Sequence, residues 1–180
     1  FVPSRGLGDV YKRQNFICGN ILLYSSFLNS IKSFLFRRSF DFYAIDEIKK
    51  LFERKKTSNN LDIKNSYGFI RSCENIIHFN QLLWSGKFND LRESNIHKLF
   101  KRMSNYKTII NEEDLSAIID AYYYFRKIEN YLHLKQNTFQ NIVNEDDPYL
   151  NEVSNNYYEK LTSKREKVIK IYENLFSPKS

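Results

Sequence analysis

Residues 61–86 read LDIKNSYGFIRSCENIIHFNQLLWSG. Apolar and polar residues alternate over 61–64, which predicts a short extended segment there. A polar turn follows and contains Gly68, after which the sequence becomes a long apolar helix that ends at Gly86. An extended segment, a glycine turn and a helix start are a common way to hold residues at the lip of a cleft. Residues 61–86 are therefore the first candidate for a functional site.

On both sides of this stretch, apolar residues recur at helical spacing. The spacing predicts helices over 20–36, 44–56, 95–103 and 111–136, and one or two helices between 149 and 176. Only five glycines and three prolines occur in 180 residues, which argues against a turn-rich β fold. Hydrophobic residues make up 42% of the chain, enough for a sizeable core. We predict an all-α multi-helix bundle with one short extended segment near residues 61–64.

The first fourteen residues, FVPSRGLGDVYKRQ, differ in composition from the rest of the chain. They hold two of the five glycines and one of the three prolines, whereas the remainder is rich in Asn, Lys, Ile, Tyr and Phe. The run GLGDVYKRQ is similar to a translated sequencing adapter, so we interpret residues 1–14 as a non-native, disordered scar. The alternative is a native disordered tail. Either interpretation predicts that this chain is a fragment of a protein that begins upstream.

Net charge and cysteine usage indicate which partners and which cellular setting to expect. The formal net charge of +7 includes three basic residues and one acidic residue from 1–14, which leaves +5 for the rest. The one dense basic run, at 49–56, is typical of a solvated helix end, so we predict no nucleic-acid partner. Cys18 and Cys73 lie too far apart in sequence to be a ligand pair, which indicates a reducing, cytoplasmic setting.

Neither a membrane span nor a metal site is predicted. The most apolar segment, 21–36, is interrupted by Asn29 and Lys32 and is short for a membrane span. His78, His97 and His133 show no metal-ligand spacing, so we interpret them as ordinary packed or exposed histidines.

Four blocks together resemble a known family. They are FLFRRSFDFYAI at 34–45, DIKNSYGFIRSCENIIHFNQLLWSG at 62–86, AYYYFRKIENYL at 121–132 and KREKVIKIYENLF at 164–176. In order and spacing they are similar to the bifunctional glutamine synthetase adenylyltransferase/adenylyl-removing enzyme. Its middle block reads approximately I-K-x-G-x-G-G-I-R-[DE]-I-E-F-x-x-Q-x-x-Q-L. The matching positions here are Lys64, Gly68, Ile70, Arg71, Glu74, Gln81 and Leu82. Phe69 departs from it, because it replaces the second glycine.

The resemblance implies a domain organisation. Family members have two halves, each a nucleotidyltransferase palm followed by a helical domain. The R-R-x-x-D-F block and the I-R after the turn look more like the half that removes AMP from glutamine synthetase. By this resemblance, residues 15–60 are linker helices from the palm, and residues 61–177 are a helical domain of the adenylyltransferase/uridylyltransferase type.

The resemblance also implies cofactors, partners and roles for residues. The family's G-S-x-x-D-x-D signature is absent, so we expect no catalytic residue, no metal ligand and no activity in this fragment alone. Mg and ATP/ADP, with glutamine synthetase and the PII signal protein as partners, are implied for the intact enzyme. Lys64 and Gly68 would border the nucleotide's phosphates; the alternative is a solvated lysine and a turn glycine. Arg71 with Glu74, and Arg126 with Glu129, would be polar pairs that tie helices together.

Two alternative functions stay open at this point. One is the related helical domain of a PII-protein uridylyltransferase, which shares the K-x-x-x-G-G-x-R theme. The other is a degenerate, non-catalytic helical interaction module. The upstream coding sequence separates them, because a G-S-x-x-D-x-D motif there indicates an enzyme.

Overall fold

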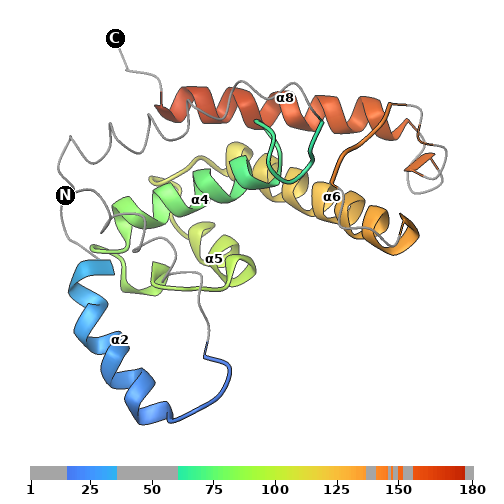
Figure 1. The fold of residues 1–180 in the computed structure, drawn as a ribbon. Helices are drawn as coiled ribbons and strands as arrows, with labels where there is room; N and C mark the ends of the chain where they lie inside the picture. Colours follow the sequence, from blue (N-terminus) through green and yellow to red (C-terminus); the bar gives the residue numbers. More distant parts are fainter. Residues whose placement is uncertain are drawn as a thin grey trace, which may run out of the picture. The chain divides into compact units, whose positions relative to one another are not determined.

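The computed structural model describes residues 16–35, 61–136, 141–145, 147, 150–151 and 156–176. The helices are α2 (Ile21–Leu35), α4 (Ile70–Trp84), the 3-10 helix η1 (Asn89–Leu91), α5 (Ile96–Met103), α6 (Glu112–Gln136) and α8 (Tyr157–Phe176) (Figure 1). No strand occurs in the described part of the chain, so the predicted all-α class is confirmed. The predicted helix over 44–56 and the scar at 1–14 lie outside the described residues.

The expected extended segment is present but short. Asp62 forms an isolated antiparallel bridge with Ile142. On either side of it, the Ile63 N–H donates to the Asn141 carbonyl at 2.8 Å, and the Val143 N–H donates to the Leu61 carbonyl at 2.9 Å. From residue 63 the chain already turns toward α4, because the Asp62 carboxylate accepts the backbone N–H groups of Lys64 and Asn65.

Asparagine side chains cap the starts of α2, α5 and α6. At α2, the Asn20 side chain accepts the N–H groups of Leu22 and Leu23 at 2.9 and 3.2 Å. The Asn95 side chain accepts the N–H groups of His97 and Lys98 at 3.0 and 3.1 Å, so α5 begins at the next residue. Asn111 accepts the Asp114 N–H at 2.7 Å at the start of α6. The first turn of α6 holds three acidic residues, which favour the positive end of the helix dipole. The predicted starts of these three helices, at 20, 95 and 111, are thus confirmed to within one residue.

The described residues divide into two compact units. One comprises the described residues within 1–41 and 77–110, and the other those within 42–76 and 111–180. Helix α4 contributes residues 77–84 to the first unit and residues 70–76 to the second.

In the second unit, α6 and α8 pack side by side (Figure 1). The predicted apolar stripe of α6 is buried along its length, at Leu115, Ile118, Tyr122, Phe125, Ile128 and Leu132. On α8, Leu175 is half-buried, and four further apolar or aromatic residues are buried: Leu161, Val168, Ile171 and Tyr172. The turn before α4 completes this core through Phe69, whose ring meets Phe125 edge to face at 5.2 Å.

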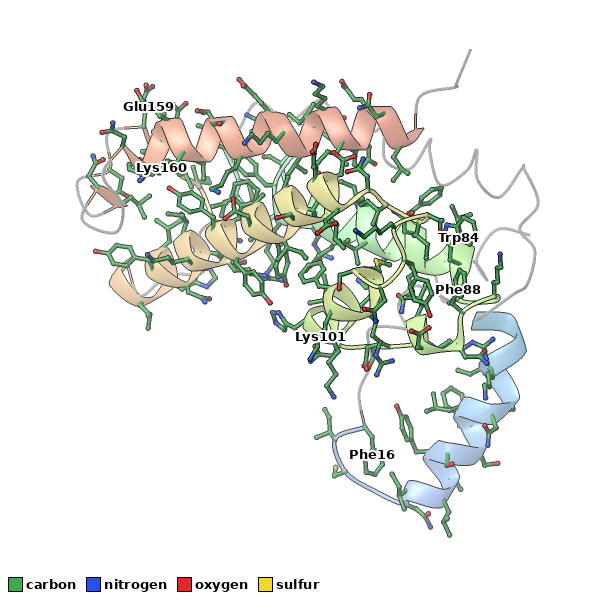
Figure 2. The ribbon with its side chains drawn as sticks, turned by 180° about the vertical axis from the view of Figure 1, so that it is seen from behind. Phe16, Trp84, Phe88, Lys101, Glu159 and Lys160 are labelled. Atoms are coloured by element: carbon green, nitrogen blue, oxygen red, sulfur yellow. The ribbon has the colours of Figure 1, made fainter. Side chains whose placement is uncertain are left out.

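In the first unit, η1 and α5 are in contact and bury Leu91, Leu99, Phe100 and Met103. The buried Gln81 amide holds the segment between them by donating to the carbonyls of Leu91 and Glu93, each at 2.7 Å. Figure 2 shows Trp84 and Phe88 beside each other. Their ring centroids lie 6.1 Å apart. Within the described ranges, none of the helices has both the length and the apolar character needed to span a bilayer.

Candidate functional site

The turn between the bridge and α4 is held by its own hydrogen bonds. One Asp62 carboxylate oxygen accepts the N–H groups of Lys64 and Asn65, both at 2.9 Å. The Asp62 carbonyl accepts the Ser66 N–H at 2.9 Å, and Ser66 Oγ accepts the Asp62 N–H at 3.2 Å. With so many internal bonds over five residues, the turn presents Lys64 from a defined backbone.

The backbone donors at the start of α4 already have acceptors. The N–H groups of Ile70 and Arg71 donate to the carbonyls of Ile63 and Lys64 at 3.2 and 3.1 Å. The Gly68 N–H donates to Ser72 Oγ at 2.9 Å. A helix start binds anions through N–H groups that lack such partners. Any contact with an anion at this turn must therefore come from side chains in this conformation.

Lys64 is the candidate side chain for such a contact. Its Nζ lies 3.8 Å from Glu129 Oε1 on α6, an ion-pair distance that is longer than a hydrogen bond. The Lys64 side chain is 37% exposed, whereas that of Glu129 is 4% exposed. Glu129 Oε1 is buried and accepts no hydrogen bond from the described residues. The ammonium therefore both faces solvent and compensates a buried carboxylate oxygen.

Behind Lys64, Arg126 joins α4 to α6. Its Nη1 donates to Glu129 Oε2 at 2.6 Å, its Nη2 to Glu74 Oε1 at 2.8 Å and its Nε to the Tyr122 hydroxyl at 3.2 Å. Burial alone would lower the pKa of Arg126, but hydrogen bonds to Glu129 and Tyr122 outweigh it and raise that pKa. We call Glu74, Tyr122, Arg126, Glu129 and Lys64 the ion cluster.

Of the four residues predicted to form polar pairs, three belong to the ion cluster. Glu74, Arg126 and Glu129 meet there, and Arg126 pairs with both glutamates. The fourth, Arg71, bonds to the turn through its backbone N–H. Its side chain makes no ion pair with another residue of the described ranges, so the Arg71–Glu74 pair is not among the contacts found there.

Gly68 lies against α8 and is buried. Its φ of +88° is a backbone conformation that favours glycine. A Cβ at this position would lie 2.7 Å from Ile169 Cγ1 and 2.8 Å from Arg165 Cγ. The structure thus requires a glycine here for two reasons, backbone conformation and close packing against α8.

Sequence reasoning missed the side chains of α8 that contact this turn. Arg165 Nε donates to the Tyr67 carbonyl at 3.0 Å, and its guanidinium carbon lies 4.9 Å from the centroid of the Phe69 ring. Burial, together with Glu173, raises the pKa of Tyr67 to about 12. The available signal was the spacing of Arg165, Tyr172 and Glu173 on one side of the predicted last helix.

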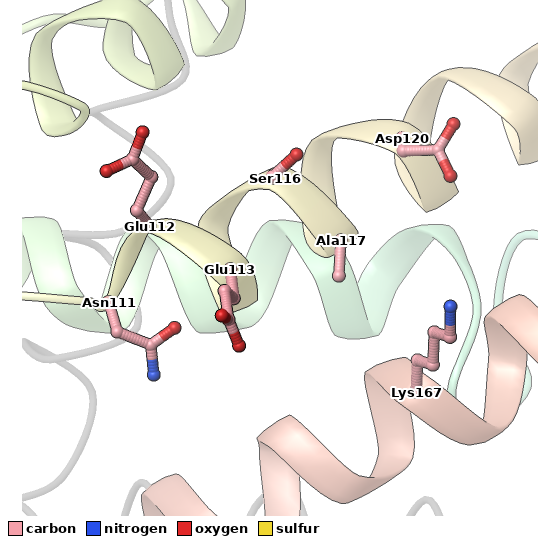
Figure 3. A pocket seen from close by; sticks show the side chains of 7 residues that line it. All are labelled: Asn111, Glu112, Glu113, Ser116, Ala117, Asp120 and Lys167. Atoms are coloured by element: carbon pink, nitrogen blue, oxygen red, sulfur yellow. The ribbon is translucent and has the colours of Figure 1, made fainter.

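A separate open groove of about 840 Å³ lies between the first turns of α6 and the middle of α8 (Figure 3). Its lining residues from α6 are mostly acidic or small, and Lys167 comes from α8; the set is Asn111, Glu112, Glu113, Ser116, Ala117, Asp120 and Lys167. Neither Lys64 nor Gly68 is among them. Within the described ranges, no three or more His, Cys, Asp or Glu side chains gather as a metal site would require.

Comparison with known proteins finds distant relatives. No protein-family model matches the chain. The bifunctional glutamine synthetase adenylyltransferase/adenylyl-removing enzyme of Stenotrophomonas maltophilia is 27% identical over 135 residues, which covers 72% of this chain and 14% of that protein. The enzymes of the same name from Mannheimia haemolytica and Acinetobacter baylyi are 30% and 29% identical, over 57% of this chain and 11% and 12% of theirs. The matched part of the chain is therefore a small portion of each relative's length.

Proposed function

We propose that this chain is the helical domain of a protein that adds AMP to glutamine synthetase or removes it. The observation that carries the proposal is the agreement among relatives: enzymes of one name, from several bacterial species, match more than half of the chain. The all-α fold supports it, because a helical domain is what the four sequence blocks imply.

Within that function, we assign the chain to the half that removes AMP. The assignment rests on the R-R-x-x-D-F block at 37–42 and on Ile70-Arg71 after the turn. Catalytic carboxylates, with the Mg that they would hold, belong to a palm encoded upstream. The PII signal protein would be a regulatory partner, and the setting would be cytoplasmic. The helical domain of a PII-protein uridylyltransferase is the related alternative.

Lys64 is the residue of this chain that we assign to the nucleotide. Its ammonium is more than a third exposed, and its one ion pair within the described residues is the loose contact with Glu129. An ammonium in this position can donate to a phosphate oxygen of ATP or ADP without a change in the backbone. Glu129 would keep the side chain extended when no nucleotide is bound.

A specific observation favours a second candidate, a non-catalytic helical module. Phe69 fills the core where the family has glycine, and the N–H groups around the start of α4 have acceptors. Both features prevent the backbone at the start of α4 from donating to a phosphate.

The deciding experiment uses the longer protein, expressed with its upstream coding sequence. Purified glutamine synthetase, in adenylylated and unmodified forms, is incubated with that protein, Mg and either phosphate or ATP, and its mass is measured. We expect AMP to be removed from the adenylylated form. The 180-residue chain should be inactive in the same assay. A folded longer protein that neither adds nor removes AMP, or that lacks the G-S-x-x-D-x-D carboxylates, would support the non-catalytic module.

The role of Lys64 is tested separately by Lys64→Ala in the longer protein. Transfer of AMP from glutamine synthetase to phosphate gives ADP, so loss of a charge-assisted hydrogen bond should weaken MgADP binding about tenfold, as measured by calorimetry. Lys170→Ala is the matched control, since it removes the same charge from an exposed position on α8. Equal affinity in wild type and Lys64→Ala would show that Lys64 serves only as a partner of Glu129.

A further inference from the structure

One face of α8 holds the turn that precedes α4. Arg165, Ile169, Tyr172 and Glu173 follow one another at helical spacing, and each lies beside residue 67 or 68. The Tyr172 ring meets the Tyr67 ring edge to face at 5.3 Å, and the Tyr67 hydroxyl lies 3.5 Å from Glu173 Oε1. All of these contacts lie within one compact unit.

Arg165 makes the most specific of these contacts. Its Nε donates to the Tyr67 carbonyl at 3.0 Å, while the guanidinium lies over the Phe69 ring at 4.9 Å. The same side chain therefore restrains the residues before and after Gly68. A planar guanidinium can donate in its plane and stack with its face at once, which a lysine ammonium cannot do.

The backbone of Lys64 is fixed by hydrogen bonds within this turn. The Lys64 carbonyl accepts the Arg71 N–H at 3.1 Å, and its own N–H donates to Asp62 at 2.9 Å. Between these two bonds the backbone of Lys64 cannot move without moving the turn. A displacement of residues 67–69 away from α8 would strain both bonds and carry the lysine side chain with it.

We propose that Arg165 is a positioning residue: it fixes the turn on α8 and thereby holds Lys64 where a nucleotide phosphate can meet it. The nucleotide part of this inference rests on the proposed function. The positioning part does not, because it concerns contacts within this chain alone.

The positioning part is tested by amide hydrogen exchange in the 180-residue chain. The reporters are the N–H groups of Gly68, Ile70 and Arg71, each bonded within the turn or to Ser72. We expect Arg165→Ala to speed their exchange about tenfold more than that of core amides in α6 such as Ile128. Arg165→Lys should restore part of the protection, and Lys170→Ala should change neither set. Equal acceleration of both sets, or no change at the turn, would overturn the proposal.

The link to Lys64 is tested by a double-mutant cycle on MgADP affinity in the longer protein. If Arg165 acts through Lys64, Arg165→Ala should weaken binding in the wild type but add nothing in the Lys64→Ala background. Additive losses would refute the link. If Lys64→Ala alone has no effect, the nucleotide part falls with the assignment of Lys64, whereas hydrogen exchange still decides whether Arg165 holds the turn. Absence of any AMP transfer or removal by the longer protein would count against the proposed function alone.

Discussion

Gly68 is the residue at which backbone and packing requirements coincide. Its φ is +88°, and a side chain there would meet Ile169 and Arg165 closer than normal contact distance. Gly19 has a φ of +118° with nothing within 4 Å of an added Cβ. Gly68 thus combines a positive φ with close packing, whereas Gly19 has a positive φ alone. Substitutions at the two positions therefore distinguish the cost of backbone strain from the cost of steric contact.

We predict that Gly68→Ala destabilises the protein more than Gly19→Ala does. A non-glycine residue at positive φ costs about 1–3 kcal/mol, and overpacking against α8 adds about 1–3 kcal/mol at position 68 only. Urea denaturation of both variants measures the difference in unfolding free energy. Adding Ile169→Ala should reduce the loss caused by Gly68→Ala, because it removes the nearest side-chain atoms. Equal losses in the two alanine variants would mean that contact with α8 is not what requires the glycine.

At the scale of elements, the ion cluster joins α4 and α6 through one guanidinium. Glu74 is 9% exposed and Glu129 is 3% exposed, so both carboxylates depend on Arg126 for compensation, and Glu129 depends on Lys64 as well. A buried carboxylate that loses its cation keeps the cost of desolvation without the attraction that offset it.

We predict that Arg126→Met lowers the free energy of unfolding by about 3–5 kcal/mol, since it leaves two buried carboxylates without their main partner. Arg102→Met is the matched control. Arg102 and Arg126 are similarly exposed, at 37% and 34%, but Arg102 pairs with one carboxylate, that of Glu93 at 2.7 Å, whereas Arg126 pairs with two. The loss of Arg102 should therefore cost less, about 1 kcal/mol. Chemical denaturation of both variants gives the comparison. Similar small losses in both would show that the ion cluster contributes little to holding the helices together.

The contact between the turn and α8 should weaken at alkaline pH. Burial, and then the charge and hydrogen bond of Glu173, raise the pKa of Tyr67 to about 12 from an ordinary value of 10. A group with a raised pKa in the folded state stabilises that state fully below pH 10, and this contribution is lost as pH rises through about 12.

We therefore predict that the wild type loses more stability between pH 10 and 12 than Tyr67→Phe does. Unfolding free energies at several pH values measure this difference. Tyr123→Phe serves as a control because Tyr123 is 47% exposed. If Tyr67→Phe and the wild type show the same pH dependence over this range, the inference that the pKa of Tyr67 is raised is wrong.

For the whole molecule, composition sets the residues at 1–14 apart from the rest. We predict that deleting them leaves the melting temperature unchanged, because their glycine- and proline-containing sequence is foreign to the remaining chain. Thermal unfolding followed by circular dichroism tests this. A clearly lower melting temperature of the shortened chain would show that the segment packs and that its interpretation as a scar is wrong.

Local sequence was sufficient for the helices and much of the core. The apolar spacing within 111–136 predicts both α6 and its buried stripe, because a 3.6-residue period places those side chains on one face. The caps formed by Asn95 and Asn111 explain why α5 and α6 start where the spacing predicts, because a cap binds N–H groups two or three residues away. Interactions of this range are encoded in neighbouring residues, so they can be found without the fold.

The environment of the turn before α4 depends on how the helices pack, so it could not be predicted from the sequence. Arg126 reaches Glu74 across 52 residues, and Arg165 reaches Tyr67 across 98. The sequence placed Lys64 and Gly68 at one turn, but it could not show that Lys64 meets Glu129 on α6 while Gly68 meets Ile169 on α8. Such contacts depend on how helices far apart in the chain approach each other, and that approach depends on side-chain packing across the whole interface rather than on any local pattern.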